Sequence, residues 1–366
     1  AINFGQDSSF AGLKTAQGNQ DSNSIGDFYY TPPTGFLALC TKNLPDVAVT
    51  PSEHFNTVLY SGNGSTQSIT GVGFQSDFSW FKNRNGTQVH QLFDAVRGVA
   101  NSLRSNSTDA ENTDSPNDRL TSFDSDGFSL GADGNPNGSG NTYVAWNWKA
   151  NGSGSSNTDG TINTTATSAN VDAGFSIITY SGNGTSGATI GHGLSKAPEF
   201  FTVKRRSSGG DDWQTYYGDN TDFLRLNSYV ATSDNAAIWN DTSPSSSVIT
   251  LGNHAEVNSS GETYVCYAFH SVDGYSKVGS YSGNANADGT FVYTGFKPMW
   301  VMVKRTTSNH DWDIYDSKRS TFNAMDDRLR ANDNTAEADG GDIDFTSNGF
   351  KLRQTGNGNG SGDYIY

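Results

Sequence analysis

Bulky apolar residues alternate with small or polar residues along several short stretches of the chain. In TYVAWNWK (142–149), the side chains of Val144, Trp146 and Trp148 would share one face of an extended segment, because successive side chains of a strand point to opposite faces. This period of two predicts a half-buried strand. The segments FFTVK (200–204) and WVMVK (300–304) are apolar at both sets of alternate positions. We therefore expect these two strands in the middle of a sheet.

The chain repeats itself three times. The pentapeptide YSGNG at 60–64 returns at 180–184, and YSGNA follows at 281–285. Each copy closes with a similar phrase: NGSGNTYVAWNWK (137–149), NSSGETYVCYAFH (258–270) and NGSGDYIY (359–366). The opening and closing tyrosines are 83, 84 and 83 positions apart. Such regular spacing predicts one β unit that occurs in three copies.

Gly, Asn, Asp and Ser separate the apolar stretches, and these residues favour tight turns. Short strands at short intervals are typical of β-sandwiches. We predict an all-β chain of serial, separate β-sandwich modules of the jelly-roll or concanavalin-like type. The boundaries are 47–150 for repeat 1, 175–270 for repeat 2 and 271–366 for repeat 3. The polar stretch 151–174 is predicted to be either a linker or an edge strand.

Two details complete the predicted organisation. The segments 94–106 and 320–332 lie at equivalent places in their repeats and predict either a loop or a short helical excursion in each repeat. The third copy stops at DYIY (363–366), where the other two continue along the same strand. We therefore expect repeat 3 to be truncated and the chain to be either a piece of a longer polypeptide or only its ordered part.

Composition excludes several classes of protein. Aromatic residues make up 12% of the chain, enough to build a packed core, so disorder is not expected. The net charge of −15 and the lack of a basic stripe argue against nucleic-acid binding. No apolar run is long enough to predict membrane insertion. The two cysteines, Cys40 and Cys266, are too few for a disulfide scaffold.

A basic pair precedes an Asp-Trp pair in two of the repeats, and this pattern is a candidate glycan-binding site. If a hairpin joins the two pairs, an indole face would lie beside an arginine and an aspartate and form a platform for a sugar. The alternative is a cation–π and ion-pair brace inside the sandwich. Repeat 1 has NGTQVHQLF (85–93) instead. The candidate residues are Lys204, Arg205, Asp212, Trp213, Lys304, Arg305, Asp311 and Trp312.

Asp133, Asn135 and Asn137 follow the first half of a calcium-binding loop, D-x-[DN]-x-[DN]-G. The closing Glu of an EF-hand is missing, because Val144 takes the twelfth position. Calcium is therefore the one cofactor that the sequence suggests, and an ordinary turn is the alternative. The acidic pairs Asp124/Asp126 and Asp211/Asp212 fall in predicted turns, and no catalytic motif is present. We do not expect an enzyme.

The start of the chain resembles a known family. INFGQ (2–6) followed by YTPPTGFLALCTKNLP (30–45) resembles the C-terminal end of a SPRY-type, concanavalin-like β-sandwich of marine bacteriophage virion proteins. A polar insertion at about 7–27 departs from the shorter versions. The rest resembles the triplicated phage module that often follows, through phrases such as SWFKNRN, LFDAVRG, TYVAWNWKA and YDSKR. Residues 1–46 would then be the C-terminal part of a SPRY or lectin-like sandwich.

The resemblance implies a non-enzymatic structural protein at the virion surface. We expect a tail-fibre or appendage adhesin that contacts host-surface polysaccharide, that binds other virion proteins and that forms a homo-oligomer such as a trimer. Repetition of a weak site would raise avidity. The leading alternative is a head-decoration or tail-shaft protein without receptor binding. Further alternatives are an extracellular filament subunit and a polysaccharide depolymerase.

Overall fold

The computed structural model describes residues 5–43, 49–113 and 118–366. The chain divides into two compact units, residues 1–48 and 49–366. Within its described part, unit 1 consists of turns, one isolated bridge between Asn19 and Phe28, and the 3-10 turn η1 (Thr41–Asn43). The end of a SPRY-like sandwich stays a prediction there, and residues 2–4 and 44–45 of its two motifs lie outside the described residues.

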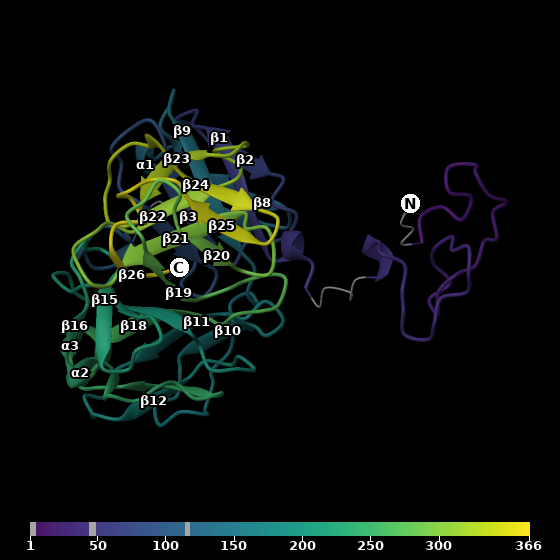
Figure 1. The fold of residues 1–366 in the computed structure, drawn as a ribbon. Helices are drawn as coiled ribbons and strands as arrows, with labels where there is room; N and C mark the ends of the chain where they lie inside the picture. The colour runs from purple at the N-terminus through teal and green to yellow at the C-terminus, as the bar shows by residue number, and fades with distance from the viewer. Residues whose placement is uncertain (1–4, 44–48, 114–117) are drawn as a thin grey trace. The chain divides into compact units, whose positions relative to one another are not determined.

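Unit 2 contains three modules, which we call module 1 (49–150), module 2 (151–270) and module 3 (271–366) (Figure 1). Module 1 contains η2 (Pro51–Glu53), β1 (Phe55–Ser61), β2 (Gln67–Thr70), β3 (Phe78–Asn83), β4 (Gln91–Asp94), β5 (Asn101–Ser102), β6 (Asn112–Thr113), β7 (Leu120–Asp124), β8 (Gly127–Leu130), α1 (Gly134–Asn137) and β9 (Thr142–Trp148). Module 2 contains β10 (Ala166–Asn170), β11 (Phe175–Ser181), β12 (Ala188–Gly191), β13 (Phe200–Arg205), β14 (Gln214–Tyr216), β15 (Asp222–Arg225), β16 (Ser233–Asp234), α2 (Ala236–Trp239), β17 (Val248–Leu251), α3 (Ala255–Asn258) and β18 (Thr263–Phe269). Module 3 contains β19 (Ser280–Gly283), β20 (Phe291–Tyr293), β21 (Trp300–Arg305), β22 (Asp313–Asp316), β23 (Met325–Arg330), β24 (Ala338–Thr346), β25 (Gly349–Leu352) and β26 (Gly362–Ile365).

The all-β prediction is confirmed. In module 1 the sheet β1-β9-β3-β4 packs on the sheet β2-β8-β7, and Phe81, Phe93, Phe128 and Leu130 fill the space between them. Module 2 has the sheet β10-β11-β18-β13-β14-β15-β16 and the pair β12-β17. Module 3 joins its strands into one eight-stranded sheet, β19-β26-β21-β22-β23-β24-β25-β20.

β10 lies at the edge of the module 2 sheet, so of the two alternatives for 151–174 the structure shows an edge strand. Among the described residues, no helix has the length and apolar character needed to cross a membrane.

Neither of the two segments forms a helix, so the helical alternative is wrong in both. Within 320–332 the chain forms β23, and within 94–106 it forms turns and the short strand β5. In each segment the leucine of a Leu-Arg pair, Leu103 or Leu329, is buried in a core. Packing of that leucine, rather than local helix propensity, decides the backbone conformation there, since tertiary contacts commonly override weak propensities.

A repeated clasp explains why the phrase YSGN recurs. The ring of Tyr60 stacks on that of Tyr143 with 5.1 Å between centroids, and its hydroxyl donates to the carbonyl oxygen of Pro136 at 2.6 Å. The buried Asn137 next to it accepts from the backbone N–H of Asn63 at 3.0 Å. The corresponding residues form the same clasp in the other modules: Tyr180, Tyr264, Asn183 and Asn258, and then Tyr281, Tyr364, Asn284 and Asn359. The clasp thereby joins β1 to β9, β11 to β18 and β19 to β26.

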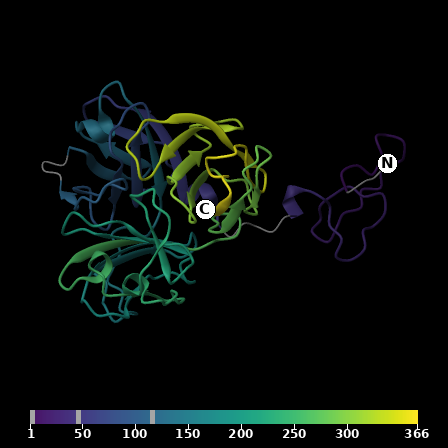
Figure 2. The same cartoon turned by 60° about the vertical axis from the view of Figure 1, so that its left-hand side comes forward.

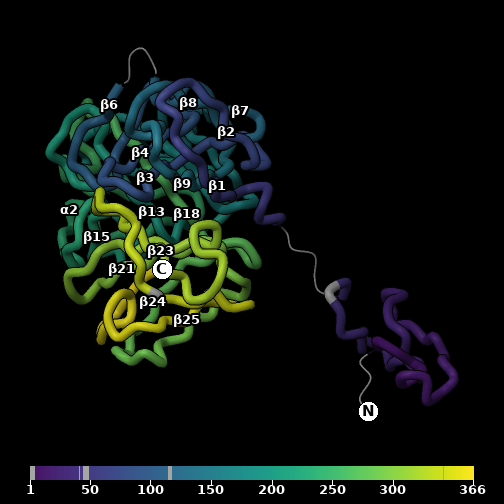
Figure 3. The backbone as a smooth tube through the Cα atoms, turned by 90° about the horizontal axis from the view of Figure 1, so that it is seen from above, coloured from purple at the N-terminus to yellow at the C-terminus, as the bar shows by residue number. Residues whose placement is uncertain are grey.

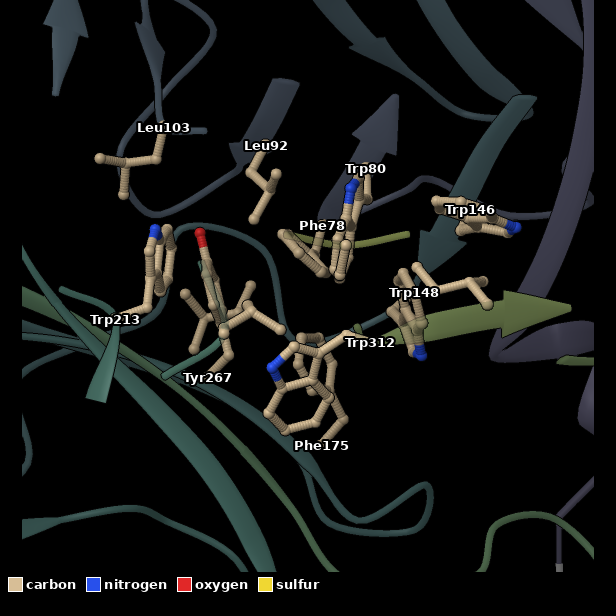
Figure 4. Packing of buried hydrophobic residues seen from close by; sticks show 14 of the residues in the cluster. Phe78, Trp80, Leu92, Leu103, Trp146, Trp148, Phe175, Trp213, Tyr267 and Trp312 are labelled. Atoms are coloured by element: carbon tan, nitrogen blue, oxygen red, sulfur yellow. The ribbon is translucent and has the colours of Figure 1, made fainter. Parts of the chain in front are cut away.

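The three modules surround one shared core instead of standing in series. Figure 2 shows the dark blue, teal and yellow-green modules side by side, and Figure 3 follows the backbone from one to the next. A single buried cluster takes residues from all of them, including Trp146, Tyr267 and Trp312 (Figure 4). The prediction of separate sandwiches is therefore wrong. It also follows that β9 is buried on both faces, not half-buried, because Val144 and Trp146 face the shared core.

Candidate functional site

The two tryptophans of the predicted glycan site lie at the junctions between modules. The side chains of Trp213 and Trp312 are 0% and 1% exposed. The indole Nε1–H of Trp213, in module 2, donates to the carbonyl oxygen of Arg104 in module 1 at 2.9 Å. That of Trp312, in module 3, donates to the carbonyl oxygen of Arg225 in module 2, also at 2.9 Å. Each indole thus ties its own module to the preceding one.

His90 completes this series in module 1. It takes the position that a tryptophan occupies in the other modules, and its Nε2 lies 2.9 Å from the carbonyl oxygen of Arg330 in module 3. Its Nδ1 accepts the indole N–H of Trp80 at 2.7 Å, so Nε2 must carry the proton and donate. Burial lowers the pKa of His90 to about 3, which keeps the ring neutral. The three contacts together close a ring of modules.

The predicted basic residues also lie inward. The Nζ of Lys204 donates to the carbonyl oxygen of Thr108 in module 1 at 3.1 Å, and that of Lys304 donates to the carbonyl oxygen of Tyr229 in module 2 at 3.1 Å. Burial lowers the pKa of both lysines to about 8. Lys82, in the same place in module 1, is buried as well and has its pKa lowered to about 8 by burial.

The acidic members of the pattern form ion pairs within their own modules. Asp212 forms an ion pair with Arg225 at 2.8 Å, and Asp311 forms one with Arg330 at 3.2 Å. Arg205 pairs with Glu262 at 3.0 Å, and the guanidinium of Arg305 lies over the ring of Tyr364. The structure thus brings the eight predicted residues together in two groups, but as internal braces. No sugar can stack on the buried rings of Trp213 and Trp312. Of the two alternatives from the sequence, the structure therefore shows an internal brace and not a sugar platform.

Backbone and ionic contacts repeat around the ring. At each junction a backbone N–H of one module donates to a carbonyl oxygen of another: Glu111 to Arg206, Thr232 to Thr306 and Glu337 to Arg84, at 2.9, 3.1 and 2.7 Å. In two of the three junctions the same residues also form ion pairs, Glu111 with Arg206 at 2.8 Å and Glu337 with Arg84 at 2.7 Å. At the third junction the corresponding residues are Thr232 and Thr306, whose side chains carry no charge.

Buried arginines extend these ion pairs into the core. Arg97 pairs with Asp94 at 2.6 Å and with Glu111 at 2.8 Å, and Asp94 also accepts the hydroxyl of Tyr267 from module 2 at 2.7 Å. In module 3, Arg319 pairs with Asp316 and Glu337 in the same way, and Asp316 accepts the indole N–H of Trp146 at 2.9 Å. The charges are therefore satisfied across the junctions, as buried charges must be.

The predicted calcium loop is a braced turn. Asp133 accepts the backbone N–H of Asn135 at 2.7 Å, as the N-cap of α1, and forms an ion pair with Arg119 at 3.1 Å. The side-chain oxygen of Asn137 accepts from Asn63 and from Gln67, which uses both of its lone pairs. Among the described residues no group of three or more His, Cys, Asp or Glu side chains is placed to hold a metal ion.

An apolar cavity of about 260 Å³ opens where the modules meet. All three modules contribute to its wall, with Phe78, Trp148, Phe175, Phe200, Phe269 and Trp300 among the lining residues. The indole Nε1 of Trp300 is buried and has no hydrogen-bond partner in the described part of the chain. This cavity is the candidate binding site that the structure adds.

A known family spans the three modules. The family of a domain of unknown function, DUF7483, matches residues 50–366. The chain belongs to this family. The DUF7483 match covers all of compact unit 2 except its first residue, so the domain corresponds to the whole ring and not to a single repeat. Neither a curated protein nor a solved structure matches the chain.

Sequence reasoning missed the ion-pair network of Arg97, Glu111, Arg319 and Glu337 in the DUF7483 domain. Arg97, Glu111, Arg319 and Glu337 were not among the candidate residues, although LFDAVRG and IYDSKRS share the spacing Asp-x-x-Arg. That shared spacing was the available signal. The acceptors on the other side of each junction are mostly backbone carbonyls, which leave no trace in a sequence.

Proposed function

We propose that the chain is a non-enzymatic structural protein of a bacteriophage particle that forms part of a surface appendage. The observation that carries the proposal is the closed ring, in which three copies of one sandwich are fixed to one another by matched contacts and a shared core. A closed unit of this kind is suited to serve as a rigid building block of a larger structure. The resemblance of the repeats to phage virion modules supplies the biological setting.

An adhesive role needs exposed groups that can contact a glycan, and module 3 presents some. Phe291 and Tyr293 lie on the same face of strand β20, and Tyr293 is 65% exposed. Phe322, in a loop of the same module, is 82% exposed. Exposed aromatic rings beside polar residues can stack on the C–H faces of sugars, so we place the proposed host-polysaccharide contact on this surface.

The second candidate is a head-decoration or tail-shaft protein that only packs against other virion chains. It is favoured by the burial of Trp213 and Trp312, because that burial removes the platform on which the adhesive role was first based. Under this reading, Phe291 and Tyr293 would contact a neighbouring virion protein.

Sedimentation with host cells separates the two candidates. Labelled full-length protein should sediment with the cells, and the supernatant should contain no new reducing sugar ends. The double variant Phe291→Ser/Tyr293→Ser should bind at least about tenfold more weakly, a change of about 1.4 kcal/mol. The matched control Tyr229→Ser removes an exposed tyrosine of module 2 and should leave binding unchanged.

Other outcomes would redirect the proposal. If the protein does not bind cells, but antibodies raised against it label the head or tail shaft of purified particles, the decoration or shaft role is correct. Release of reducing ends would instead show a depolymerase. Absence of the protein from particles would refute both virion roles.

A further inference from the structure

Each module has an equivalent short strand at the edge of a sheet: β2, β12 and β20. These strands pair in the same register with β8, β17 and β25, and the residue in the middle of each is a branched aliphatic one, Ile69, Ile190 or Val292. The positions on either side of that residue differ between the modules. They are Ser68 and Thr70 in module 1, Thr189 and Gly191 in module 2, and Phe291 and Tyr293 in module 3.

Module 2 covers its edge strand with another part of its own chain. The backbone N–H of Ile162 donates to the carbonyl oxygen of Thr189 in β12 at 2.9 Å, and the side chain of Ile162 is buried. A Cβ atom added to Gly191 would lie 1.7 Å from Oδ1 of Asn157. The covering segment therefore fits only because a glycine stands at this position of β12.

Module 3 is not covered in this way. Tyr293 takes the position of Gly191, so its side chain occupies the space that Asn157 fills in module 2. The segment that leads into module 3 turns back on itself, with a bridge between Val272 and Ser276. In the described part of the chain β20 pairs with β25 alone, as their neighbouring labels in Figure 1 show.

The outer edge of β20 presents backbone hydrogen-bonding groups. The N–H of Leu352 in β25 donates to the carbonyl oxygen of Thr290 at 3.0 Å, so the backbone groups of Thr290 face β25. Successive residues of an antiparallel strand alternate in the direction of these groups. The N–H and C=O groups of Phe291 and Tyr293 therefore point away from β25, toward the outer edge.

The side chains of β20 lack the usual protection of an edge strand. Proteins commonly place charged residues or prolines on such strands, because a free edge invites pairing with another strand. β20 has neither, and its three residues Phe291, Val292 and Tyr293 all favour extended structure. Val292 is buried in the core of module 3, whereas Phe291 is 46% exposed and Tyr293 is 65% exposed.

We propose that β20 is an interface between two copies of this chain, which pair antiparallel along this edge about a two-fold axis at Val292. The edge is self-complementary, as a two-fold interface requires: Phe291 of each copy lies opposite Tyr293 of the other, and the outward N–H and C=O groups of both residues bond across the axis. Aromatic pairs directly opposite each other stabilise an antiparallel ladder. A covering segment like that of module 2 is excluded by Tyr293, whereas an edge-on strand is not.

The pairing should be reversible. Three residues from each copy bury far less than the roughly 1,200 Å² at which stable interfaces begin. The inference does not depend on the proposed polysaccharide contact, because the backbone of β20 carries it and the four rings stay on the solvent face.

Sedimentation velocity of the full chain over a range of concentrations tests the dimer. Phe291→Pro removes one outward N–H and one ring and leaves the bonds to β25 in place, since proline is tolerated on the open side of an edge strand. It should raise the dissociation constant of the dimer at least about tenfold. The matched control Ser68→Pro changes the equivalent position of β2 and should leave the dimer unchanged. A chain that stays monomeric, or equal effects of the two prolines, would overturn the proposal.

Cross-linking tests the register without relying on a proline variant. With Cys40 replaced by serine, Phe291→Cys in one copy and Tyr293→Cys in another should lie about 5.5 Å apart between Cα atoms, as opposite residues of a bonded pair do, within reach of a disulfide. Mild oxidation of the mixture should join the two variants to each other, as peptide mass spectrometry can show. Two copies of the same variant place their cysteines diagonally, about 7–8 Å apart, and should join poorly. Equal yields, or no cross-link, would refute the two-fold pairing.

Discussion

At the residue scale, the fold depends on a few buried polar side chains that the repeats share. Asn137, Asn258 and Asn359 are fully buried, and each donates through its amide nitrogen to carbonyl oxygens of two turns. A buried polar side chain costs free energy unless it is hydrogen-bonded, so these residues stabilise only one arrangement of the turns. The recurrence of Asn in the opening and closing phrases follows from this requirement.

The substitution Asn258→Asp tests the clasp of module 2. The new oxygen would face the carbonyl oxygens of Thr185 and Gly252, to which the amide nitrogen now donates at 2.9 and 3.0 Å. We expect urea unfolding to show a loss of about 3 kcal/mol. Asn253→Asp, at an exposed position two residues before the start of α3, should change stability by less than about 0.5 kcal/mol. Equal effects would contradict this account.

His90 should make the stability of unit 2 depend on pH. In the unfolded chain a histidine binds a proton near pH 6.5, whereas burial lowers the pKa of folded His90 to about 3. The unfolded state therefore binds more protons between these values, and stability falls as the pH drops below 6.5. From pH 7 to pH 5 the contribution of His90 is about 2 kcal/mol. Urea unfolding measures the free energy of unfolding at pH 7 and at pH 5. In the His90→Gln variant the difference between these two values should be smaller by about 2 kcal/mol. An unchanged difference would refute the role of His90.

At the element scale, the sequence predicted the positions of the strands well, but it did not predict what packs against the second face of each strand. The alternation in 142–149 correctly predicted β9, but its second face is covered by a shared core that no single repeat reveals. The apolar pattern on both faces of FFTVK and WVMVK has the same origin: Phe201 and Val203 face the sandwich of module 2, and Phe200 packs against the shared core. The false helix at 94–106 arose because Val96, Val99 and Leu103 have helical spacing although each belongs to a different turn or bridge.

The charged junction between modules 1 and 2 gives a test at this scale. Glu111 faces both Arg97 and Arg206, so Glu111→Gln leaves two cations with less compensation, and removal of one partner from a buried pair is costly. We expect a loss of about 2–3 kcal/mol in urea unfolding. Adding Arg206→Gln should recover part of that loss, since the corresponding residues of the next junction, Thr232 and Thr306, form their backbone contact without an ion pair.

The control for this junction is an exposed ion pair in the same module. Arg104 and Asp109 lie 2.6 Å apart, but the Asp109 side chain is more than half exposed. Asp109→Asn should therefore cost no more than about 0.5 kcal/mol. If Glu111→Gln costs as little, the junction pairs do not hold the modules together.

At the scale of the whole molecule, ring closure was beyond prediction from the sequence. The indoles of Trp213 and Trp312 were recognised as special, yet their partners are backbone carbonyls of Arg104 and Arg225, which any residue could supply. The contact of His90 with module 3 joins residues 240 positions apart. Pattern reasoning therefore found these residues and offered two roles, an exposed platform and an internal brace; the structure shows them buried, but between modules and not inside one sandwich.

A shared core predicts that the modules unfold together. Cys266 is buried in module 2, so its reaction with a thiol reagent reports on that module once exposed Cys40 has been replaced by serine. In this background Asn359→Asp, which disrupts the clasp of module 3, should lower the urea midpoint for Cys266 reactivity as much as the midpoint for tryptophan fluorescence. Independent modules would instead leave the Cys266 midpoint unchanged and give more than one transition.

Each module carries both the donor and the acceptor of the junction contacts on opposite flanks. This is a head-to-tail interface, in which the rotation that relates one module to the next produces a closed ring after three modules. A polypeptide of one repeat would therefore have every contact it needs to form a cyclic homotrimer with copies of itself. Four fused repeats would have no place for the extra copy, so closure itself sets the number of copies in the domain.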